Sequence, residues 1–378
     1  MKLIINCSNL YVGGGVQVSL SFINELKKIN KAHEYHIFLS KAIDKQLEKK
    51  LFPDNIYFYL IEKSPATLKT RKQIVAQLDT LEKQIKPDVV FSVFGPSYWK
   101  PKAKHVMGFA NACVLQKNSV DYDEFSFLKR MKKWLRAEYG SYYVKRDATH
   151  YIIETEDGKS RLSNVLKLPK SNISVVGNSY SDIFEDEAYL NESHPGYIQL
   201  PKKEDDEFRL LLVSHNYPQK NLKIIGQVLP LLRNMNLKFV LTIDEKSYNS
   251  LFPTKPKQVL NLGPISQKAC PSLYAQCDAL FLPTLLEVFS ASYPEAMKME
   301  KPILTSNYSF TTDVCQDAAL YFDPLDPKNI AKKIKYFIEH EALQKELIVK
   351  GKKRVKEFET ARFRAEKYIE LCENIRNK

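Results

Sequence analysis

Two glutamates late in the chain stand where a bound ligand could be recognised. Glu287 and Glu295 have seven residues between them, an apolar run over 280–283 precedes them, and a predicted helix opens near Pro294. In an open α/β sheet, ligands bind beyond the carboxyl ends of strands, and the loop that carries Glu287 has such a position. Carboxylates repel phosphate but accept hydrogen bonds from hydroxyl groups. We therefore expect Glu287 to bind a sugar ring and Glu295 to bind a ribose.

The residues between these glutamates are expected to bind phosphate. At a helix start the backbone N–H groups lack helical partners, and the helix dipole favours negative charge there. The four residues expected to do so are Phe289, Ser290, Ala291 and Ser292. A second interpretation concerns Glu295: Ser292-Tyr-Pro-Glu295 has the spacing of a capping box with proline in the first turn. The cap and the ribose contact are equally supported, and one residue can serve both roles.

The turn between a predicted strand over 208–214 and a predicted helix over 221–233 carries residues expected to meet a diphosphate. This is the position of the phosphate turn in a dinucleotide-binding fold. Lys220 can reach a diphosphate as a point charge. His215 adds a second donor when it is protonated, and Asn216 lies in the same turn. Taken alone, a lysine at a helix start is more often a solvated surface charge.

A third turn, Val12-Gly-Gly-Gly-Val16, follows the first apolar run of the chain. Gly14 and Gly15 allow the backbone to approach a ligand closely and expose N–H groups at a helix start. The turn does not match G-x-G-x-x-G, and no acidic residue follows the second predicted strand to hold a ribose. On its own this turn is a weak signal of nucleotide binding.

Short apolar runs alternate with helical patterns along the chain, which predicts parallel βαβ units. In the first half we predict strands at 3–5, 35–39, 56–60 and 89–93 and helices at 16–29 and 67–85. In the second half we predict strands at 208–214, 238–243, 258–262, 279–282 and 302–304 and helices at 221–233, 267–277, 294–299, 328–339, 342–357 and 361–376. The fold class these predictions favour is α/β, with two Rossmann-like domains facing each other across a deep cleft.

Residues 191–207 combine proline, glycine and dense charge, which makes them the best candidate for a domain boundary. We therefore predict a first domain over 1–200 and a second over 201–357. A final helix over 358–378 could cross back to the first domain.

The stretch 127–146 is both basic and aromatic, with apolar side chains at helical spacing. A basic amphipathic helix with aromatic anchors is typical of a segment that lies on an anionic membrane surface. A helix packed on the first domain with a solvated basic face is equally compatible with the pattern. If the helix does meet a membrane, the expected contacts are Lys129, Arg130, Lys132, Lys133 and Trp134.

The composition limits the possible classes of protein. The chain has 378 residues and a formal net charge of +13, which suits nucleic acid, an anionic membrane or a phosphorylated substrate as partner. The six cysteines form no C-x-x-C pair and the histidines are dispersed, so no metal site is expected. Because no apolar run is long enough to span a bilayer, we expect a cytoplasmic protein.

Together these segments resemble the retaining glycosyltransferases of family 4, which have the GT-B fold. The spacing Glu287-x7-Glu295, followed by Ala-Met, matches the motif of that family. Leu262-Gly-Pro-Ile265 is similar to its nucleobase-contacting turn, and residues 273–283 are similar to the segment before the motif. The first domain resembles the family through the glycine turn, the strand–helix order and Phe94-Gly-Pro-Ser-Tyr-Trp99. This last segment looks like that of bacterial surface-polysaccharide (O-antigen or capsule) transferases.

The resemblance implies a role for each candidate residue of the second domain. Lys220 matches the diphosphate-binding lysine of the family, Glu287 its contact to the donor sugar and Glu295 its ribose ligand. Gly263 and Ile265 belong to the turn that contacts the base. The second domain would thus bind a nucleotide sugar, and the first domain would bind the acceptor.

The chain also departs from the family. His215 replaces an arginine, and His, unlike Arg, loses its charge near neutral pH. Larger residues, Val288-Phe-Ser-Ala-Ser292, replace a glycine-containing run after the first glutamate. The histidine that the family has in its first domain finds no motif match here. His105 and Asn111 are the candidates for an acceptor or sugar contact, and a structural role for His105 is the alternative.

The resemblance implies retaining transfer of a hexosyl unit from a UDP- or GDP-sugar to a hydroxyl of a glycan acceptor, with no metal or other cofactor. The basic helix suggests an acceptor linked to a lipid such as a polyprenyl diphosphate, at the cytoplasmic face of the membrane, in lipopolysaccharide or capsule biosynthesis. Rival functions on this fold are a nucleotide-sugar epimerase, a phosphorylase and a catalytically silent scaffold. A nucleic-acid-binding module is disfavoured, because the basic residues are not organised around aromatic strands or a recognition helix.

Overall fold

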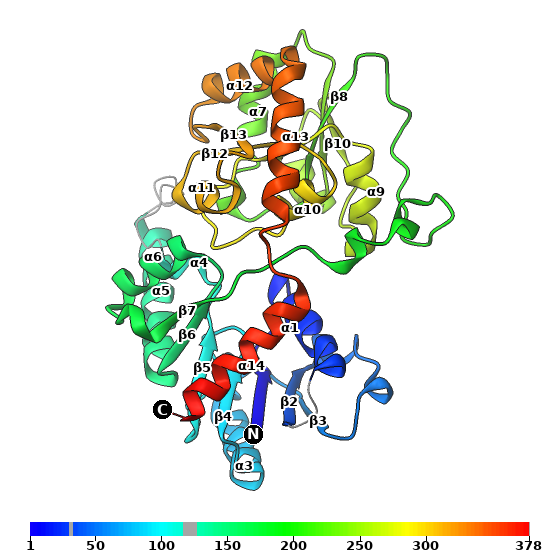
Figure 1. Ribbon diagram of the computed structural model, residues 1–378. Coiled ribbons are helices and arrows are strands. Elements are labelled where there is room, and N and C mark those ends of the chain that lie inside the picture. The colour runs from blue at the N-terminus through cyan, green and yellow to red at the C-terminus, as the bar shows by residue number, and fades with distance from the viewer. Residues whose placement is uncertain (30–32, 116–126, 378) are drawn as a thin grey trace. The chain divides into compact units, whose positions relative to one another are not determined.

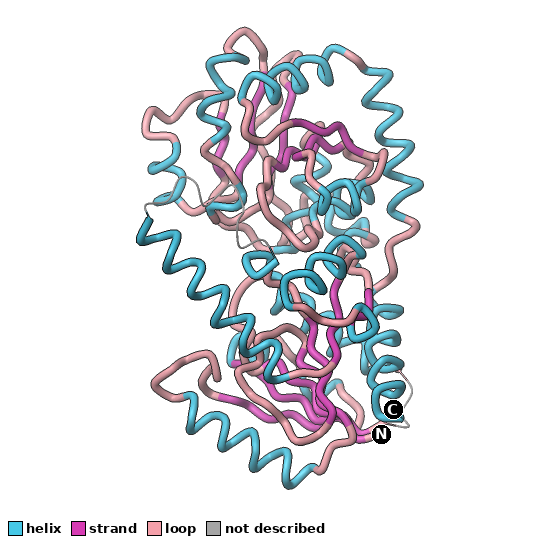
Figure 2. The backbone as a smooth tube through the Cα atoms, turned by 90° about the vertical axis from the view of Figure 1, so that its left-hand side faces the viewer, coloured by secondary structure: helices cyan, strands magenta, loops and turns pink. Residues whose placement is uncertain are grey.

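The chain folds into two units, each built on a parallel β-sheet (Figure 1). The computed structural model describes residues 1–29, 33–115 and 127–377, and only the backbone of residues 113, 127–130 and 133. Among these residues the first unit holds 1–29, 33–115, 127–178 and 359–377, and the second holds 179–358. Helices lie outside the strands of each unit (Figure 2). The predicted α/β class with two Rossmann-like domains is confirmed.

The first sheet has seven strands among the described residues, in the order β3-β2-β1-β4-β5-β6-β7, and its paired strands are parallel. The strands are β1 (Lys2–Cys7), β2 (Glu34–Ser40), β3 (Ile56–Ile61), β4 (Val89–Ser92), β5 (Lys104–Gly108), β6 (His150–Ile153) and β7 (Ile173–Val175). The helices of this unit are α1 (Gly14–Glu25), α2 (Lys41–Asp44), α3 (Arg71–Ile85), α4 (Ala112–Leu115), α5 (Phe127–Asp147), α6 (Glu156–Leu166) and α14 (Ala361–Asn377).

Strand β1 is buried on both faces, as a central parallel strand should be. Leu3 and Ile5 pack into the core that includes residues of α1 and α14, whereas Ile4 packs into a second core with residues of α3 and with Trp99. Successive side chains of a strand point to opposite faces, so this alternation places helices on both sides of the sheet. The last helix therefore belongs to the core of the first unit.

The second sheet has six strands among the described residues, in the order β10-β9-β8-β11-β12-β13. The strands are β8 (Phe208–Leu212), β9 (Leu237–Leu241), β10 (Val259–Asn261), β11 (Ala279–Leu282), β12 (Ile303–Ser306) and β13 (Ala319–Phe322). The helices are α7 (Ile224–Val228), α8 (Glu245–Leu251), α9 (Cys270–Ala275), α10 (Ser292–Lys298), α11 (Ser309–Cys315), α12 (Pro327–Glu339) and α13 (Glu341–Val355).

The predicted helix over 221–233 is shorter than expected. The structure has α7 and then a 3-10 turn, Leu229–Leu232, which contains Pro230. Proline has no N–H to donate and its ring clashes with the preceding helical turn, so it ends a regular α-helix.

The domain boundary predicted at residue 200 is wrong. The structure divides the chain between Asn178 and Ser179, and residues 179–200 pack on the second unit. Leu200 is buried in the core of that unit, and its N–H donates to Gln276 Oε1 at 2.8 Å. The proline, glycine and charge of 191–207 therefore mark a surface segment that is tied to the second unit by side-chain contacts the sequence does not reveal.

Candidate functional site

The second sheet reverses its strand order between β8 and β11. These two strands are neighbours in the sheet. From β8 the chain continues to β9 and β10 on one side, and from β11 it continues to β12 and β13 on the other side. In an open α/β sheet, ligands bind beyond the carboxyl ends of the strands at such a switch point. The loops that follow β8 and β11 carry Lys220 and Glu287 respectively, so the topology brings these two candidates to one place.

The loop after β8 is held in place by hydrogen bonds to other loops of the second unit. A short 3-10 turn, Pro218–Lys220, ends at Asn221, which has a left-handed φ of 54° and is 3% exposed. The side chain of Asn221 donates to the carbonyl of Pro324 at 2.9 Å. The N–H of Leu285, in the loop after β11, donates to the carbonyl of Gln219 at 2.8 Å. The two loops are therefore fixed to each other.

Lys220 and Glu287 form an ion pair across these loops. Lys220 Nζ lies 2.6 Å from Glu287 Oε2, and the two side chains are only 16% and 21% exposed. The charges are therefore partly shielded from water. An ionic hydrogen bond is stronger in such a place than at the fully exposed surface. The pair places a cation and a hydroxyl-accepting carboxylate side by side, the combination that a sugar linked to a diphosphate requires.

Glu295 lies in the first turn of α10, in the interior of the second unit. It is 7% exposed, and Tyr274 donates its hydroxyl proton to Glu295 Oε2 at 3.1 Å. Burial raises the pKa of Glu295 from 4.5 to about 7, and the Tyr274 hydrogen bond opposes that rise. The capping box expected from Ser292 is wrong, because α10 begins after Ala291 without a side-chain cap and Glu295 bonds to Tyr274 instead.

The other candidates of the second unit are less buried. The loop residues Phe289, Ser290, Ala291 and Ser292 are half-buried between Glu287 and the first turn of α10. His215 is exposed, with its ring 5.6 Å from that of Tyr217, and Asn216 is half-buried. Gly263 follows β10 with a φ of +75°, in open space, and Ile265 packs against the core.

Tyr274 and Asn221 are the site residues that the sequence argument missed. Tyr274 stands 21 residues before Glu295, so only the fold reveals their contact. Asn221 had a usable signal, because asparagine tolerates the left-handed conformation that ends a turn better than most residues do.

The first sheet has its own switch point, between β1 and β4. Helix α1 begins at Gly14, two residues earlier than predicted, after Gly13 at a φ of +71°. A side chain at Gly14 would meet nothing within 4 Å, whereas at Gly15 it would touch Leu10. The turn is thus open to a ligand at Gly14.

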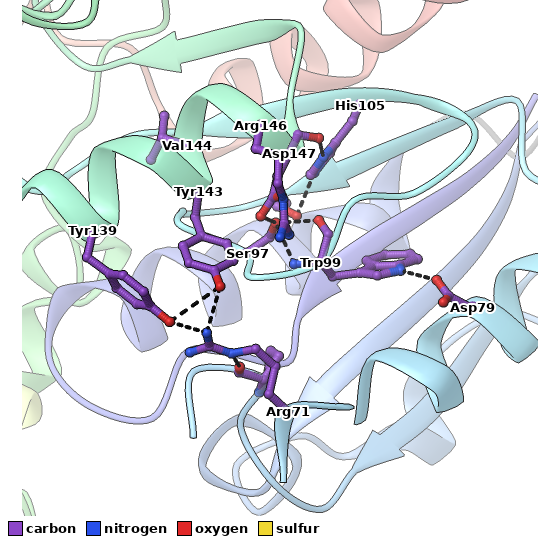
Figure 3. Close-up of polar contacts among 12 residues, drawn as sticks. Arg71, Asp79, Ser97, Trp99, His105, Tyr139, Tyr143, Val144, Arg146 and Asp147 are labelled. Atoms are coloured by element: carbon purple, nitrogen blue, oxygen red, sulfur yellow. Dashed lines mark hydrogen bonds and ion pairs between the residues drawn. The ribbon is translucent and has the colours of Figure 1, made fainter. Parts of the chain in front are cut away.

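The acceptor contact expected of His105 is not supported. His105 lies in β5, is 3% exposed, and uses both ring nitrogens inside the protein. Figure 3 shows its contact with Asp147. Nδ1 donates to the carbonyl of Asp147 at 2.6 Å, so Nε2 accepts from Ser92 at 2.8 Å. Burial lowers the pKa of His105 to about 4 and keeps the ring neutral. His105 is a structural residue, whereas Asn111 is half-buried just before α4.

Helix α5 confirms the predicted helical segment and presents an apolar face outward. Met131, Trp134, Leu135 and Tyr142 are 42%, 47%, 52% and 59% exposed. Residues on the opposite side of the helix, such as Ala137 and Val144, are buried. Lys132 is exposed, while the side chains of Lys129, Arg130 and Lys133 lie outside the described residues. No helix in the described part of the chain is both long and apolar enough to cross a membrane.

Arg71 anchors α5 to the rest of the first unit (Figure 3). Its guanidinium donates to the hydroxyls of Tyr139 and Tyr143, and to the carbonyls of Pro65 and Ala66 at 2.7 and 2.8 Å. It also stacks on the ring of Tyr98, with 4.6 Å from Cζ to the centroid. Nothing in the sequence pattern pointed to this residue.

Comparison with known proteins agrees with this geometry. Residues 197–354 match the family model "Glycosyl transferases group 1". No curated protein sequence matches the chain. A glycosyltransferase from Rickettsia africae is similar in structure, with 15% identity, 99% of this chain and 98% of that chain covered, and a TM-score of 0.73.

Two further solved structures share the fold. HepE from Anabaena, in complex with UDP and glucose, has 13% identity, 99% coverage of both chains and a TM-score of 0.72. WaaG, a glycosyltransferase involved in lipopolysaccharide biosynthesis, has 12% identity, covers 98% of this chain and 99% of that chain, and has a TM-score of 0.70. The chain thus has the GT-B fold, and most of its second unit matches the group 1 glycosyltransferase family model.

Proposed function

We propose that the chain is a retaining glycosyltransferase that moves a hexosyl unit from a nucleotide sugar to a hydroxyl of a glycan acceptor. The observation that carries this proposal is the Lys220–Glu287 pair at the switch point of the second sheet, inside the domain that matches the group 1 family. The pair supplies a cation for the diphosphate and a carboxylate for the sugar hydroxyls, which are the two polar parts of such a donor.

Each remaining candidate has a place in this donor site. Glu295 binds the ribose in its ionised form, the turn at Gly263 and Ile265 contacts the base, and the N–H groups of 289–292 bind the diphosphate. The acceptor hydroxyl attacks on the face from which the diphosphate leaves, which retains the anomeric configuration. Catalysis then consists of positioning that hydroxyl and stabilising the leaving charge with Lys220 and His215.

Transfer without a bound divalent cation is part of the proposal. Lys220 offsets the diphosphate charge, and the described residues contain no group of three His, Cys, Asp or Glu side chains suited to a metal. Activity that persists in EDTA supports this; activity that returns only on adding Mg²⁺ or Mn²⁺ contradicts it.

UDP-glucose is the first donor to test, because the similar Anabaena structure holds UDP and glucose. Calorimetry against UDP- and GDP-sugars should find one that binds, and saturation at about a hundredfold excess over Kd should stabilise the fold by about 2.7 kcal/mol. Lys220→Ala should abolish binding. Lys335→Ala, an exposed position on α12, is the matched control and should bind as wild type does.

Product analysis separates this function from its rivals. A transferase needs an acceptor and yields a product with the donor's anomeric configuration by NMR. An epimerase converts the donor with no acceptor, and a phosphorylase requires inorganic phosphate. A chain that binds no nucleotide sugar is a silent scaffold.

A lipid-linked acceptor at the cytoplasmic membrane face is the second part of the proposal. Its support is the exposed apolar face of α5 with Lys132 beside it, and the likeness to WaaG, a protein of lipopolysaccharide biosynthesis. Vesicles of phosphatidylglycerol and phosphatidylethanolamine in equal parts should co-sediment with the wild type. Trp134→Ser with Leu135→Ser should release the protein from them, while Val349→Ser, at an exposed position on α13, should not. Unchanged sedimentation of the α5 variant contradicts membrane contact.

A further inference from the structure

Lys220 and Glu287 bind each other in the structure, although the proposed function assigns them to different parts of one ligand. Lys220 Nζ is 2.6 Å from Glu287 Oε2, which is a full ionic hydrogen bond. An ammonium that turns toward a diphosphate must weaken this bond. Donor binding is therefore an exchange of one anionic partner for another at Lys220.

Hydrogen bonds oppose a separation of the loops that carry the two residues. The N–H of Leu285 is bonded to the carbonyl of Gln219, one residue before Lys220, and the buried Asn221 side chain is bonded to the carbonyl of Pro324. Rotation of the Lys220 side chain keeps these bonds intact and leaves the Glu287 carboxylate close to the incoming diphosphate. At 21% exposure this carboxylate has limited access to water.

We infer that Glu287 is an internal counter-ion of Lys220 that makes the site discriminate between an intact nucleotide sugar and the nucleoside diphosphate it leaves behind. This inference rests on the proposed function. With an intact donor, hydroxyls of the sugar replace Lys220 as hydrogen-bond donors to Glu287. With the nucleoside diphosphate alone no sugar hydroxyl is present, and two anions share the cation. Glu287 thus weakens product binding while it strengthens donor binding.

Calorimetric titration of Glu287→Gln with UDP and with UDP-glucose tests the inference, and GDP with GDP-mannose is run in the same way. Glutamine keeps the shape and one acceptor oxygen but removes the charge. UDP should bind about fivefold more tightly than to wild type, because the competing anion is lost. UDP-glucose should bind about tenfold more weakly, because hydrogen bonds to a charged acceptor become neutral ones. Affinities that shift in the same direction for both ligands would overturn the inference.

Two variants separate charge from other effects. Glu287→Asp keeps the carboxylate and should not tighten UDP binding; if it does so as much as Glu287→Gln, charge is not the cause. Glu346→Gln removes the carboxylate of another lysine–glutamate pair at 2.6 Å, on the exposed face of α13, and should change neither affinity. Wild-type protein that binds none of the four ligands refutes the proposed function itself, whereas wild-type binding with an unaltered UDP to UDP-glucose ratio in Glu287→Gln refutes only this inference.

Discussion

The switch points of the two sheets have the same topology but hold opposite kinds of polar group. Beyond β8 and β11, Lys220 and Glu287 are charged and partly open to solvent. At β1 and β4, a neutral chain of buried hydrogen bonds runs from Asn6 to Ser92 at 3.1 Å and from Ser92 to His105 at 2.8 Å. The first arrangement can exchange partners with a ligand, and the second cannot without exposing a buried polar group.

The difference shows that the same strand order can position charged groups for a ligand in one unit and buried structural hydrogen bonds in the other. The strand order creates a site in each sheet, but the residues at the strand ends decide whether it binds charge. In the second unit the loops carry the ionic groups that a nucleotide sugar requires. In the first unit the polar residues support the strands, and the open part is a glycine turn that any glycan could approach.

The largest effect should come from the cation of the charged switch point. Lys220→Ala should lower the rate of sugar transfer roughly 10²–10³-fold, because the leaving diphosphate loses its main counter-charge. Steady-state kinetics with the donor identified by calorimetry measure this. The free energy of unfolding should fall by only about 1 kcal/mol, the cost of removing the Lys220 hydrogen bond from the partly buried Glu287 carboxylate. A rate within threefold of wild type would mean that Lys220 does not touch the leaving group.

The next effect concerns Glu295 and depends on pH. Because the pKa of Glu295 rises from 4.5 in an unfolded chain to about 7 in the fold, the folded protein binds this proton more tightly than the unfolded chain does. Stability therefore falls as the pH rises from 4.5 to 7, by about 3 kcal/mol in total. Glutamine does not titrate, so Glu295→Gln lacks this pH-dependent contribution to the free energy of unfolding. Urea unfolding at pH 5 and pH 8 should show that wild type loses stability relative to Glu295→Gln over this range, because the opposite titration of the buried His105 is common to both proteins.

Donor affinity should also depend on the titration of Glu295, but it should rise with pH whereas stability falls. A ribose hydroxyl donates to the ionised carboxylate, so raising the pH from 6 to 8 should increase the donor affinity of wild type relative to that of Glu295→Gln. Glu300→Gln, an exposed neighbour, is the control. A ratio of wild-type to Glu295→Gln affinity that does not change with pH would assign the titration to another residue.

These residues also show what a sequence can and cannot predict. Lys220 and Glu287 each follow an apolar strand, so local pattern alone placed both at strand ends. The partner of Glu295 is 21 residues away and that of His105 is the backbone of Asp147, 42 residues away. Such contacts depend on which strands become neighbours, and a single sequence without the fold does not specify this. The buried ribose candidate and the structural histidine therefore became clear only in three dimensions.

Mutation at the neutral switch point of β1 and β4 should lower the free energy of unfolding rather than the transfer rate. His105→Ala leaves the Ser92 hydroxyl and the Asp147 carbonyl without their buried partner, which should cost about 2 kcal/mol. His215→Ala is the matched change in the second unit; it should leave unfolding unchanged and lower the transfer rate. Urea unfolding and steady-state transfer kinetics of both variants give the comparison. If His105→Ala folds as stably as wild type, the hydrogen-bond chain is not what holds β4 and β5 to α5.

The smallest effects should come from the two glycine turns, and they distinguish conformation from ligand approach. Gly263 has a φ of +75°, so Gly263→Ala should destabilise the fold by about 1 kcal/mol even though its side chain would meet nothing. Gly14 is also in open space, and its helical conformation tolerates alanine, so Gly14→Ala should change unfolding by less than about 0.5 kcal/mol. Any loss of transfer rate in Gly14→Ala must then come from a methyl group in the path of a ligand. Unchanged kinetics would show that the first unit's glycine turn does not contact the substrates.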